Sequence, residues 1–576
     1  MKPRILSSVL ALWAGITVLS AQPAINRVFL FPEKVVAYEK IELSVSLDAV
    51  FDNPFDPDDV SLEAVFISPS GKEWRVPGFY SQRYRGGFSV RFSADEPGQW
   101  TYMVKVRDRN GTAGTEARKF LVGSPEKHGP IRIAENKRYL EHADGVPWYG
   151  VGMWYNGPTE PEVLDELQEK GVNYISHLIT PLETWGTGLG RYDQLLCSQI
   201  DEMLEELEKR DMQLSLNIWF HSFLSETVWG GGNIAWYTNP YALVTKAKDF
   251  YSSEEAWKYQ EKLYRYMIAR WGYSRSLALW FVIDEVNGTD GWASGDSLGA
   301  TRWAQKVHDY FKQNDPWQHL TTGTRSGGVF EWWDKAYEFF DMPGREMYEA
   351  QGFPVNGTGK IDKAVVHPLA SSYRNYHAIL DRLWKNYEKP VIIPETGWDH
   401  TFYEMSMPGY LAQYHNAIWV AMASGSPMTP FWWAYSDALN DNVVTNQMKS
   451  LARFTEKIPF STLSGLKTLN SQGKECDVYA LVSDQMIIGW AVNAETDLSG
   501  KKVLLPGITE GSYKLRLYHT WRGRFLDEEE SGIQEDFVVK AGKNGISFDL
   551  PVLKIKDGHA AYVGQDMAFI LEPAGN

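Results

Sequence analysis

The order of hydrophobic and polar positions divides the chain into three regions. Between about residues 26 and 123, apolar and polar residues alternate in short segments separated by turn residues, as in residues 100–106. Alternation with a period of two at this spacing predicts an immunoglobulin-like β-sandwich of about 100 residues. The same alternation returns after about residue 461, for example in residues 485–492, and predicts a second β-sandwich.

The region between these two has a different pattern, in which short apolar runs alternate with amphipathic stretches of helical length such as residues 194–210 and 254–270. Eight strand candidates lie at residues 148–153, 174–179, 213–219, 277–283, 319–322, 338–342, 390–393 and 428–433. This order predicts a (β/α)8 TIM barrel. A doubly wound parallel sheet is the alternative, but no G-x-G-x-x-G motif follows the first strand.

The predicted domains are therefore an N-terminal sandwich at 22–125, a barrel at 126–460 and a C-terminal sandwich at 461–576. Residues 1–21 have the three parts of a signal peptide: Lys2 and Arg4, an apolar stretch, and small residues ending at Ala21. The apolar stretch is too short and too interrupted to favour a membrane span, and no cysteine follows Ala21 to carry a lipid. We expect a secreted or periplasmic protein without membrane insertion.

Charge and cysteine content narrow the range of partners. The formal net charge is −16 and the pI is about 5.3, so the long-range field has the wrong sign for nucleic acid or an anionic membrane. The chain has two cysteines, Cys197 and Cys476, in different predicted domains. They predict neither a disulfide nor a metal cluster. We expect no metal and no cofactor, and the oligomeric state stays open.

Aromatic residues make up 14% of the chain, with 24 Trp and 30 Tyr. Their flat apolar faces and polar edges suit amphipathic ligands such as sugars. Core packing is the ordinary alternative for most of them.

Two of the predicted barrel strands end in a glutamate. Residues 280–287 read Trp-Phe-Val-Ile-Asp-Glu-Val-Asn, and residues 391–398 read Val-Ile-Ile-Pro-Glu-Thr-Gly-Trp. Glu285 would thus end the fourth strand and Glu395 the seventh, at the face where barrel enzymes build their active sites. Two carboxyl groups about 5 to 5.5 Å apart are the equipment of a retaining glycosidase.

These two segments resemble the fourth and seventh strand elements of clan A glycoside hydrolases, the group that includes the family 5 cellulases and mannanases. The resemblance spans the barrel and implies that Glu285 is the acid/base and Glu395 the nucleophile. Residues 93–102 likewise resemble the sandwich of unassigned role that often precedes such barrels. The clan usually has Asn where this chain has Asp284. An ionised Asp only accepts hydrogen bonds, and its charge would raise the pKa of Glu285; Asn287 is a possible substitute donor.

Other residues at predicted strand ends have types that suit a sugar site, although each has core or loop packing as its alternative, and His177 most of all. These substrate-binding candidates, besides Asp284 and Asn287, are Trp154, Asn156, His177, Trp219, His221, Tyr348, Trp398, His400, Trp433 and Asp437.

The Gly-Asp-Ser-Leu sequence at 295–298 also occurs in serine esterases, but here it falls at a predicted helix start, where Asp and Ser are ordinary capping residues. The sequence therefore predicts a secreted retaining β-glycoside hydrolase that cleaves a plant or algal polysaccharide, or its oligosaccharides, by double displacement. The alternative is a non-catalytic carbohydrate-binding protein on the same scaffold, which would have no need for both glutamates.

Overall fold

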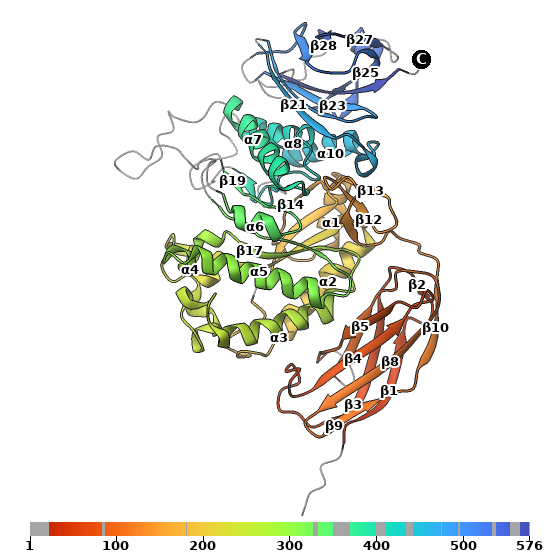
Figure 1. The fold of residues 1–576 in the computed structure, drawn as a ribbon, viewed down its shortest axis with the longest axis vertical. Helices are drawn as coiled ribbons and strands as arrows, with labels where there is room; N and C mark the ends of the chain where they lie inside the picture. The colour runs from red at the N-terminus through yellow and green to blue at the C-terminus, as the bar shows by residue number, and fades with distance from the viewer. Residues whose placement is uncertain are drawn as a thin grey trace, which may run out of the picture.

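The structure is a computed structural model, and it places three regions along the long axis of the molecule (Figure 1). Strands of the N-terminal region lie at one end, a region of mixed strands and helices lies in the middle, and the C-terminal sheet lies at the other end. The described residues are 22–82, 87–179, 181–326, 332–348, 369–397, 410–433, 442–473, 475–493, 496–532, 537–552 and 565–574. The predicted signal peptide at 1–21 lies outside them.

The N-terminal region consists of two sheets around one core. The first has the order β1(Ala24–Phe31), β3(Ile41–Asp48), β7(Phe88–Phe92), β6(Phe79–Tyr80). The second has the order β2(Val35–Val36), β10(Arg118–Gly123), β8(Gly98–Asp108), β4(Ser61–Ile67), β5(Glu73–Pro77), with β9(Gly111–Gly114) paired to β8. Phe66 of β4 and Phe92 of β7 stack across the two sheets with ring centroids 4.1 Å apart, because alternate side chains of each strand point inward.

The middle region begins with five adjacent parallel strands. Their order is β14(Gly152–Trp154), β15(Tyr174–Leu178), β16(Gln213–Phe220), β17(Leu277–Asp284) and β18(Leu320–Thr322). Three more parallel segments follow, containing β19(Met347–Tyr348), β20(Thr396–Gly397) and residues 428–432. The last segment returns to the first, since Trp154 N donates to Trp432 O at 3.2 Å. This is a TIM-barrel type of arrangement with β-rich domains at both ends.

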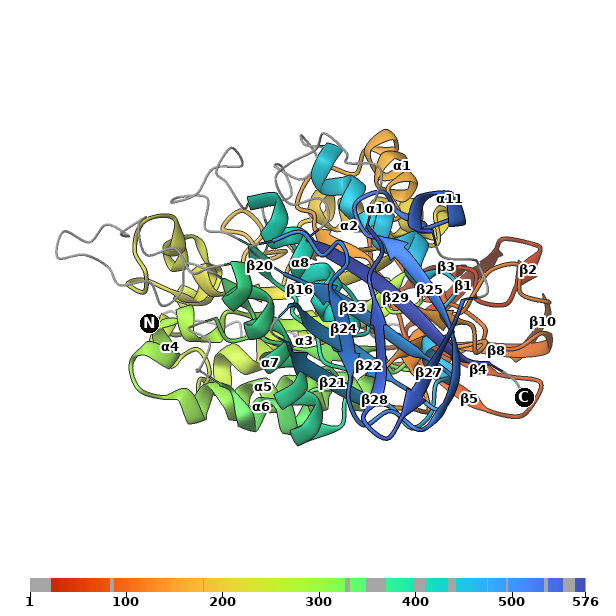
Figure 2. The same cartoon turned by 90° about the horizontal axis from the view of Figure 1, so that it is seen from above.

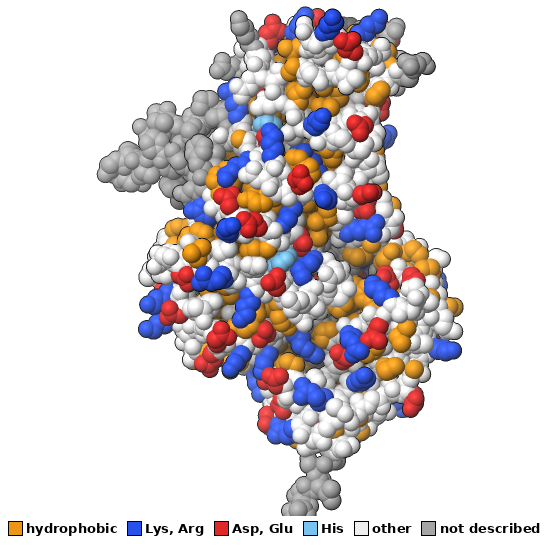
Figure 3. All heavy atoms as spheres, in the orientation of Figure 1, with side chains coloured by type: hydrophobic (Ala, Val, Ile, Leu, Met, Phe, Trp, Pro, Cys, Tyr) orange, Lys and Arg blue, Asp and Glu red, His pale blue; other side chains and the backbone are white. Residues whose placement is uncertain are grey.

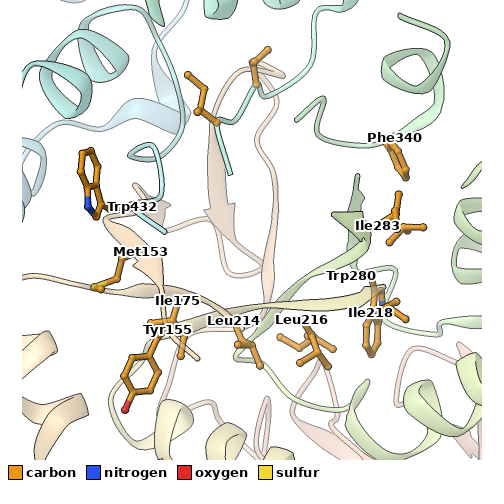
Figure 4. Packing of buried hydrophobic residues seen from close by; sticks show 14 of the residues in the cluster. Met153, Tyr155, Ile175, Leu214, Leu216, Ile218, Trp280, Ile283, Phe340 and Trp432 are labelled. Atoms are coloured by element: carbon orange, nitrogen blue, oxygen red, sulfur yellow. The ribbon is translucent and has the colours of Figure 1, made fainter. Parts of the chain in front are cut away.

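Helices connect these strands and cover their outer faces. The main ones are α1(Pro161–Glu169), α2(Gln194–Lys209), α3(Glu254–Trp271), α5(Ser297–Asn314), α6(Asp334–Phe339), α7(Leu369–Tyr387), α8(Tyr410–Ala423) and α10(Asn442–Thr455). Figure 4 shows Leu214, Leu216 and Ile218 of β16 among the side chains of the shared core. Asp296 caps α5 by accepting from Gly299 N at 2.8 Å, which is the capping role predicted for residues 295–298.

The sixth strand lies later in the chain than predicted. Residues 338 and 339 belong to α6, and the parallel pairing starts only at Gly344, which bridges to Ile392. The apolar pair Phe339 and Phe340 suggested a strand, but both rings pack against His308 of α5. The true strand segment contains two charged residues, Arg345 and Glu346, both with 0% exposure, so it does not show up as an apolar run.

The C-terminal region forms one antiparallel sheet rather than two separate ones. Its order is β21(Lys467–Gln472), β22(Asp477–Val482), β23(Ile487–Val492), β29(Asp566–Pro573), β25(Gly511–His519), β27(Val538–Gly542), β28(Gly545–Asp549), β24(Lys502–Leu505), with β26(Arg524–Phe525) paired to β25. β24 contacts β21 and β22, so the sheet folds back on itself around an apolar core. Seen from above, this sheet lies over α8, which contacts β22 and β23 (Figure 2).

Buried polar groups join the middle region to both neighbours. Asp201 of α2 accepts from Arg91 of β7 at 2.7 Å and from Arg270 of α3 at 2.7 Å, and all three side chains are at most 1% exposed. At the other end, Asp566 of β29 lies 2.9 Å from His415 of α8 and also accepts from Trp490 Nε1 at 2.7 Å. These contacts cross the domain boundaries and fix the packing there.

The surface shown in Figure 3 carries acidic and basic side chains interspersed with one another. Within the described part of the chain, no helix combines the length and the apolar character needed to cross a membrane.

Candidate active site

Four carboxyl groups meet at the C-terminal ends of the parallel strands. Asp284 is the last residue of β17, and Glu285 follows it. Glu346 and Glu395 lie in the parallel segments that begin at Gly344 and Ile392 and continue into β19 and β20. Carboxylate oxygens of Asp284, Glu346 and Glu395 all lie within 4.8 Å of one another. Glu346 also hydrogen-bonds to Glu285. The structure thus brings Glu285 and Glu395 to one cluster, with Glu346 as their common neighbour.

The four carboxyl groups differ in their access to solvent. The Glu285 side chain is 12% exposed and Glu395 is 9% exposed. Asp284 and Glu346 are 0% exposed. Glu285 and Glu395 thus keep some contact with solvent, whereas Asp284 and Glu346 have none.

The backbone at Glu285 turns sharply as β17 ends. Its φ of 53° and ψ of 57° lie in the left-handed region, which is costly for a residue other than glycine and often marks a functional site. Thr324 holds the turn, since its Oγ1 accepts from Glu285 N at 2.9 Å and also contacts Asp284 Oδ1 at 3.1 Å and Glu346 Oε1. One hydroxyl thereby positions three of the four acids.

His221 forms an ion pair with Glu285. It lies at the start of the short helix η1(His221–Leu224) after β16, with Nδ1 2.9 Å from Glu285 Oε2 and Nε2 3.3 Å from Asn233 Oδ1. Burial opposes a charge on this ring, but the hydrogen bond and the charge of Glu285 outweigh it and raise the pKa of His221. Both ring nitrogens face acceptors, so the doubly protonated imidazolium satisfies both.

The contact between His221 and Glu285 also changes the pKa of Glu285, in the direction opposite to the prediction. Burial alone would raise the pKa of Glu285, but the hydrogen bond and charge of His221 lower it. The predicted rise caused by Asp284 is therefore wrong. Instead, burial first and the charge of Glu285 second raise the pKa of Asp284 to about 7.

The pKa of Glu346 is shifted in the same direction as that of Asp284. Burial, followed by the charges of Glu285, Asp284 and Glu395, raises its pKa well above the ordinary value. Near neutral pH the buried acids thus hold protons while Glu285 is ionised. Three clustered carboxylates are ligands that hard cations prefer, but cations need ionised ligands. A cation bound here would have to displace the protons of Asp284 and Glu346.

Several predicted binding residues support the site from nearby. Trp154 is 3% exposed, and its Nε1 donates to the carbonyl of Pro394, next to Glu395, at 2.8 Å. His177 Nδ1 lies 2.9 Å from the carbonyl of Tyr155. Because a carbonyl only accepts, Nδ1 carries the proton, and burial lowers the pKa of His177 so that the ring is neutral. Asn156 is exposed, and its Oδ1 accepts from Leu178 N at 2.8 Å.

Asn287, Trp433 and Trp219 have different surroundings. The side-chain oxygen of Asn287 accepts from Ser326 N at 2.9 Å, which directs the amide group toward the loop after β18. Trp433 lies against Gly397, where a Cβ would come within 2.7 Å of its ring. Trp219 points away from the mouth: it is 4% exposed, and its Nε1 donates to Tyr264 of α3 at 2.8 Å. Trp219 is thus a core residue between sheet and helix, which was the alternative to binding.

The remaining predicted residues cannot be placed in the same way. Trp398, His400 and Asp437 lie outside the described residues. The backbone of Tyr348 belongs to β19, next to Gly397 of β20, while its side chain lies outside the described part.

Glu346 and Thr324 are site residues that the sequence reasoning missed. Glu346 lies in the strand segment that was predicted too early, and Thr324 follows the end of β18 by two residues. The available signal was the Pro-Gly pair at 343–344, which marks a turn just before the strand segment that contains Glu346.

Together, the strands and the acids at their C-terminal ends define an enzyme-like TIM-barrel arrangement with β domains, and comparison with known proteins agrees on the fold. Residues 34–107 match the family described as "Domain of unknown function (DUF5060)". A search of curated protein sequences finds no match. Among solved structures, a "putative glycoside hydrolase" from Bacteroides vulgatus ATCC 8482 aligns with a TM-score of 0.64 and 16% identity, covering 94% of this chain and 100% of that one. The chain therefore shares the fold of that protein over nearly the full length of both.

Two further solved structures align with lower scores. A glycoside hydrolase of family 5 from the same Bacteroides vulgatus strain has a TM-score of 0.47 and 15% identity, over 77% of this chain and 94% of that one. A family 39 glycoside hydrolase from Bacteroides cellulosilyticus WH2 has a TM-score of 0.43 and 13% identity, over 95% of this chain and 100% of that one.

Proposed function

We propose that this protein is a retaining β-glycoside hydrolase with Glu395 as nucleophile and Glu285 as acid/base. The observation that carries the proposal is the division of the four acids into a pair that a substrate can reach and a pair that it cannot. Glu285 and Glu395 are the reachable pair, on strands that end at the same face. Two accessible carboxyl groups in different environments are what double displacement requires.

The acid proton would come from the ion pair of Glu285 with His221. In the first step Glu395 attacks the anomeric carbon, the glycosidic bond breaks, and the leaving oxygen takes a proton from Glu285. Glu285 is ionised at rest and receives this proton from Nδ1 of His221, 2.9 Å away, so the step leaves Glu285 ionised and His221 neutral. In the second step Glu285 removes a proton from water, the resulting hydroxide attacks the anomeric carbon, and Glu395 is released. The proton that Glu285 gains in the second step returns to His221.

Asp284 and Glu346 would keep this site working by remaining neutral. If all four carboxyl groups were ionised, their repulsion would disfavour the negative charge of Glu395 that attacks the sugar. With protons on Asp284 and Glu346, negative charge remains only on Glu285 and Glu395. A protonated Asp284 can also donate a hydrogen bond, which restores the donor property of the Asn that clan A enzymes usually have there.

The proposal extends to the rest of the chain. The middle region at 126–460 would be a complete (β/α)8 barrel of clan A type, flanked by an N-terminal β-sandwich at 22–125 and a C-terminal β domain at 461–576. Residues 1–21 would direct export to the periplasm or the medium. The substrate would be a plant or algal polysaccharide or its oligosaccharides, with no nucleic acid and no membrane insertion involved.

The test is a set of single substitutions assayed on a panel of plant and algal polysaccharides with product sizing. Glu285→Gln and Glu395→Gln should each reduce the rate on the best substrate by at least about 10²-fold. Glu183→Gln is the matched control, because Glu183 is also a buried carboxyl, 3% exposed, with its pKa raised to about 7 by burial. Near-normal rates in either active-site variant would reject the roles assigned to these glutamates.

Stereochemistry and rescue test the mechanism separately. Proton NMR of the first product should show the β anomer, and inversion would overturn double displacement. Azide should restore turnover of Glu395→Gly on an activated β-glycoside and give the α-glycosyl azide. Binding of glycans by the wild-type protein without any turnover would favour the non-catalytic alternative.

A further inference from the structure

Three exposed aromatic side chains surround one side of the proposed active site. Among the described residues of 126–460, the large aromatic side chains that stay exposed are Trp185 at 52%, Trp229 at 49% and Tyr237 at 74%. Trp185 lies in the loop after β15, and the other two lie in the loop after β16. Both loops leave the C-terminal ends of their strands, which is the face that carries Glu285 and Glu395.

Two separate contacts anchor the three side chains, here called the aromatic rim. Trp185 Nε1 donates to the carbonyl of Tyr237 at 3.3 Å, which ties the two loops together. Trp229 packs edge-on against His221, with ring centroids 4.9 Å apart, and His221 contacts Glu285. The rim therefore continues to the acid/base itself.

The backbone holds Trp229 in place at some cost. Its φ of 61° lies in the left-handed region, which is unfavourable for a bulky residue. Its ring also covers Gly288, where a Cβ would lie only 2.5 Å from the ring. A large apolar ring that is held in this way and stays half exposed is available to stack on a ligand.

The order of the parallel segments decides which part of a substrate the rim would meet. Counting from β14, the segment ending in Glu395 is seventh, and β16 is third, so they lie across the ring from each other. Glu285 is on the fourth strand, next to the rim loops. The nucleophile bonds to the sugar that is retained, whereas the acid protonates the oxygen of the group that leaves. The rim is therefore on the leaving-group side.

We infer that the aromatic rim formed by Trp185, Trp229 and Tyr237 binds the sugar rings of a saccharide leaving group. This inference rests on the proposed glycosidase function and narrows its substrate class. The apolar faces of pyranose rings stack on exposed indole and phenol rings, and two loops joined side by side provide room for more than one sugar. The enzyme would cut within a chain or release an oligosaccharide, rather than act on glycosides with small leaving groups.

The kinetic test compares two substrates that share the retained sugar. One is a tetrasaccharide of the sugar found by the polysaccharide panel, and the other is its 4-nitrophenyl glycoside. In Trp185→Ala and Tyr237→Ala, the ratio of kcat/KM for the tetrasaccharide to that for the aryl glycoside should fall about tenfold. Phe29→Ala is the matched control, because Phe29 is an aromatic residue of β1 with 55% exposure. An unchanged ratio would overturn the inference, whether or not both rates fall together.

A binding measurement keeps the inference testable if turnover fails. Glu395→Gln protein is run on native gels that contain the polysaccharides of the panel, with and without the rim substitutions. Retardation by at least one polysaccharide that is lost in Trp185→Ala and kept in Phe29→Ala supports the rim. Equal retardation of all variants, or no retardation of any, overturns it. Loss of catalysis in the glutamate variants tests the proposed function alone, so the two failures can be told apart.

Discussion

Replacing Asp284 with Asn should stabilise the protein, and increasingly so as the pH rises. Asp284 is fully buried, and burial together with the charge of Glu285 raises its pKa from 3.8 to about 7. The folded state therefore holds a proton that the unfolded state has lost between about pH 4 and pH 7. Stability must fall as the pH rises through that window. Asn is nearly isosteric and has no proton to lose.

The size of the effect follows from the pKa difference. Each pKa unit corresponds to about 1.4 kcal/mol, so the raised pKa of Asp284 lowers the free energy of unfolding by up to about 4 kcal/mol above pH 7 and by about 2 kcal/mol at pH 5. For a domain of this size about 2 °C in Tm corresponds to 1 kcal/mol. The Tm advantage of Asp284→Asn over wild type should then grow by about 5 °C between pH 5 and pH 8.

Differential scanning calorimetry at several pH values measures this difference directly, because it follows each domain's transition. Asp315→Asn is the matched control. Asp315 is equally buried, but there the contact with His319, at 2.6 Å, outweighs burial and lowers the pKa of Asp315. That variant should be less stable than wild type at both pH values. A Tm difference for Asp284→Asn that stays flat or shrinks as the pH rises would show that Asp284 is ionised in the folded protein.

Three further predictions concern proton storage and domain packing. His221→Gln should lower kcat/KM about 10²-fold or more on oligosaccharides but much less on a 4-nitrophenyl glycoside, whose leaving group needs little protonation; equal losses would mean that His221 does not supply the acid proton. Glu346→Gln should keep kcat/KM within about tenfold of wild type, because both side chains are neutral, while Glu346→Ala should lose far more; equal kinetic losses in the two variants would contradict a proton on Glu346. Arg91→Met should cost about 3 to 5 kcal/mol, seen by calorimetry as a lower Tm, because it leaves Asp201 buried with one partner fewer; a change below about 1 kcal/mol would show that the pair contributes little.

The sequence predicted members of the carboxyl cluster where an acid follows a run of apolar residues. Glu285 and Glu395 were found because each ends a buried strand, and the structure brings both to one cluster. Glu346 escaped because its strand segment contains Arg345 and so lacks an apolar run. Trp219 was assigned to the site because it lies near a strand end, and periodicity alone does not tell which side of the sheet its ring packs on. The distribution of protons among the four acids depends on the contact between His221 and Glu285. These residues are 64 positions apart, so no local sequence pattern reveals the contact.

The buried contact of Asp201 with Arg91 and Arg270 has a consequence for how this architecture can be rearranged. An acid of the central domain is neutralised in part by an arginine from the domain before it. Cutting the chain between them would expose Asp201 and Arg270 to solvent on one fragment, and would leave Arg91 with Glu42 as its acidic partner on the other. A graft of the front domain onto another enzyme would therefore lose half of the acidic environment of Arg91 unless the acceptor offered an acid at the place of Asp201.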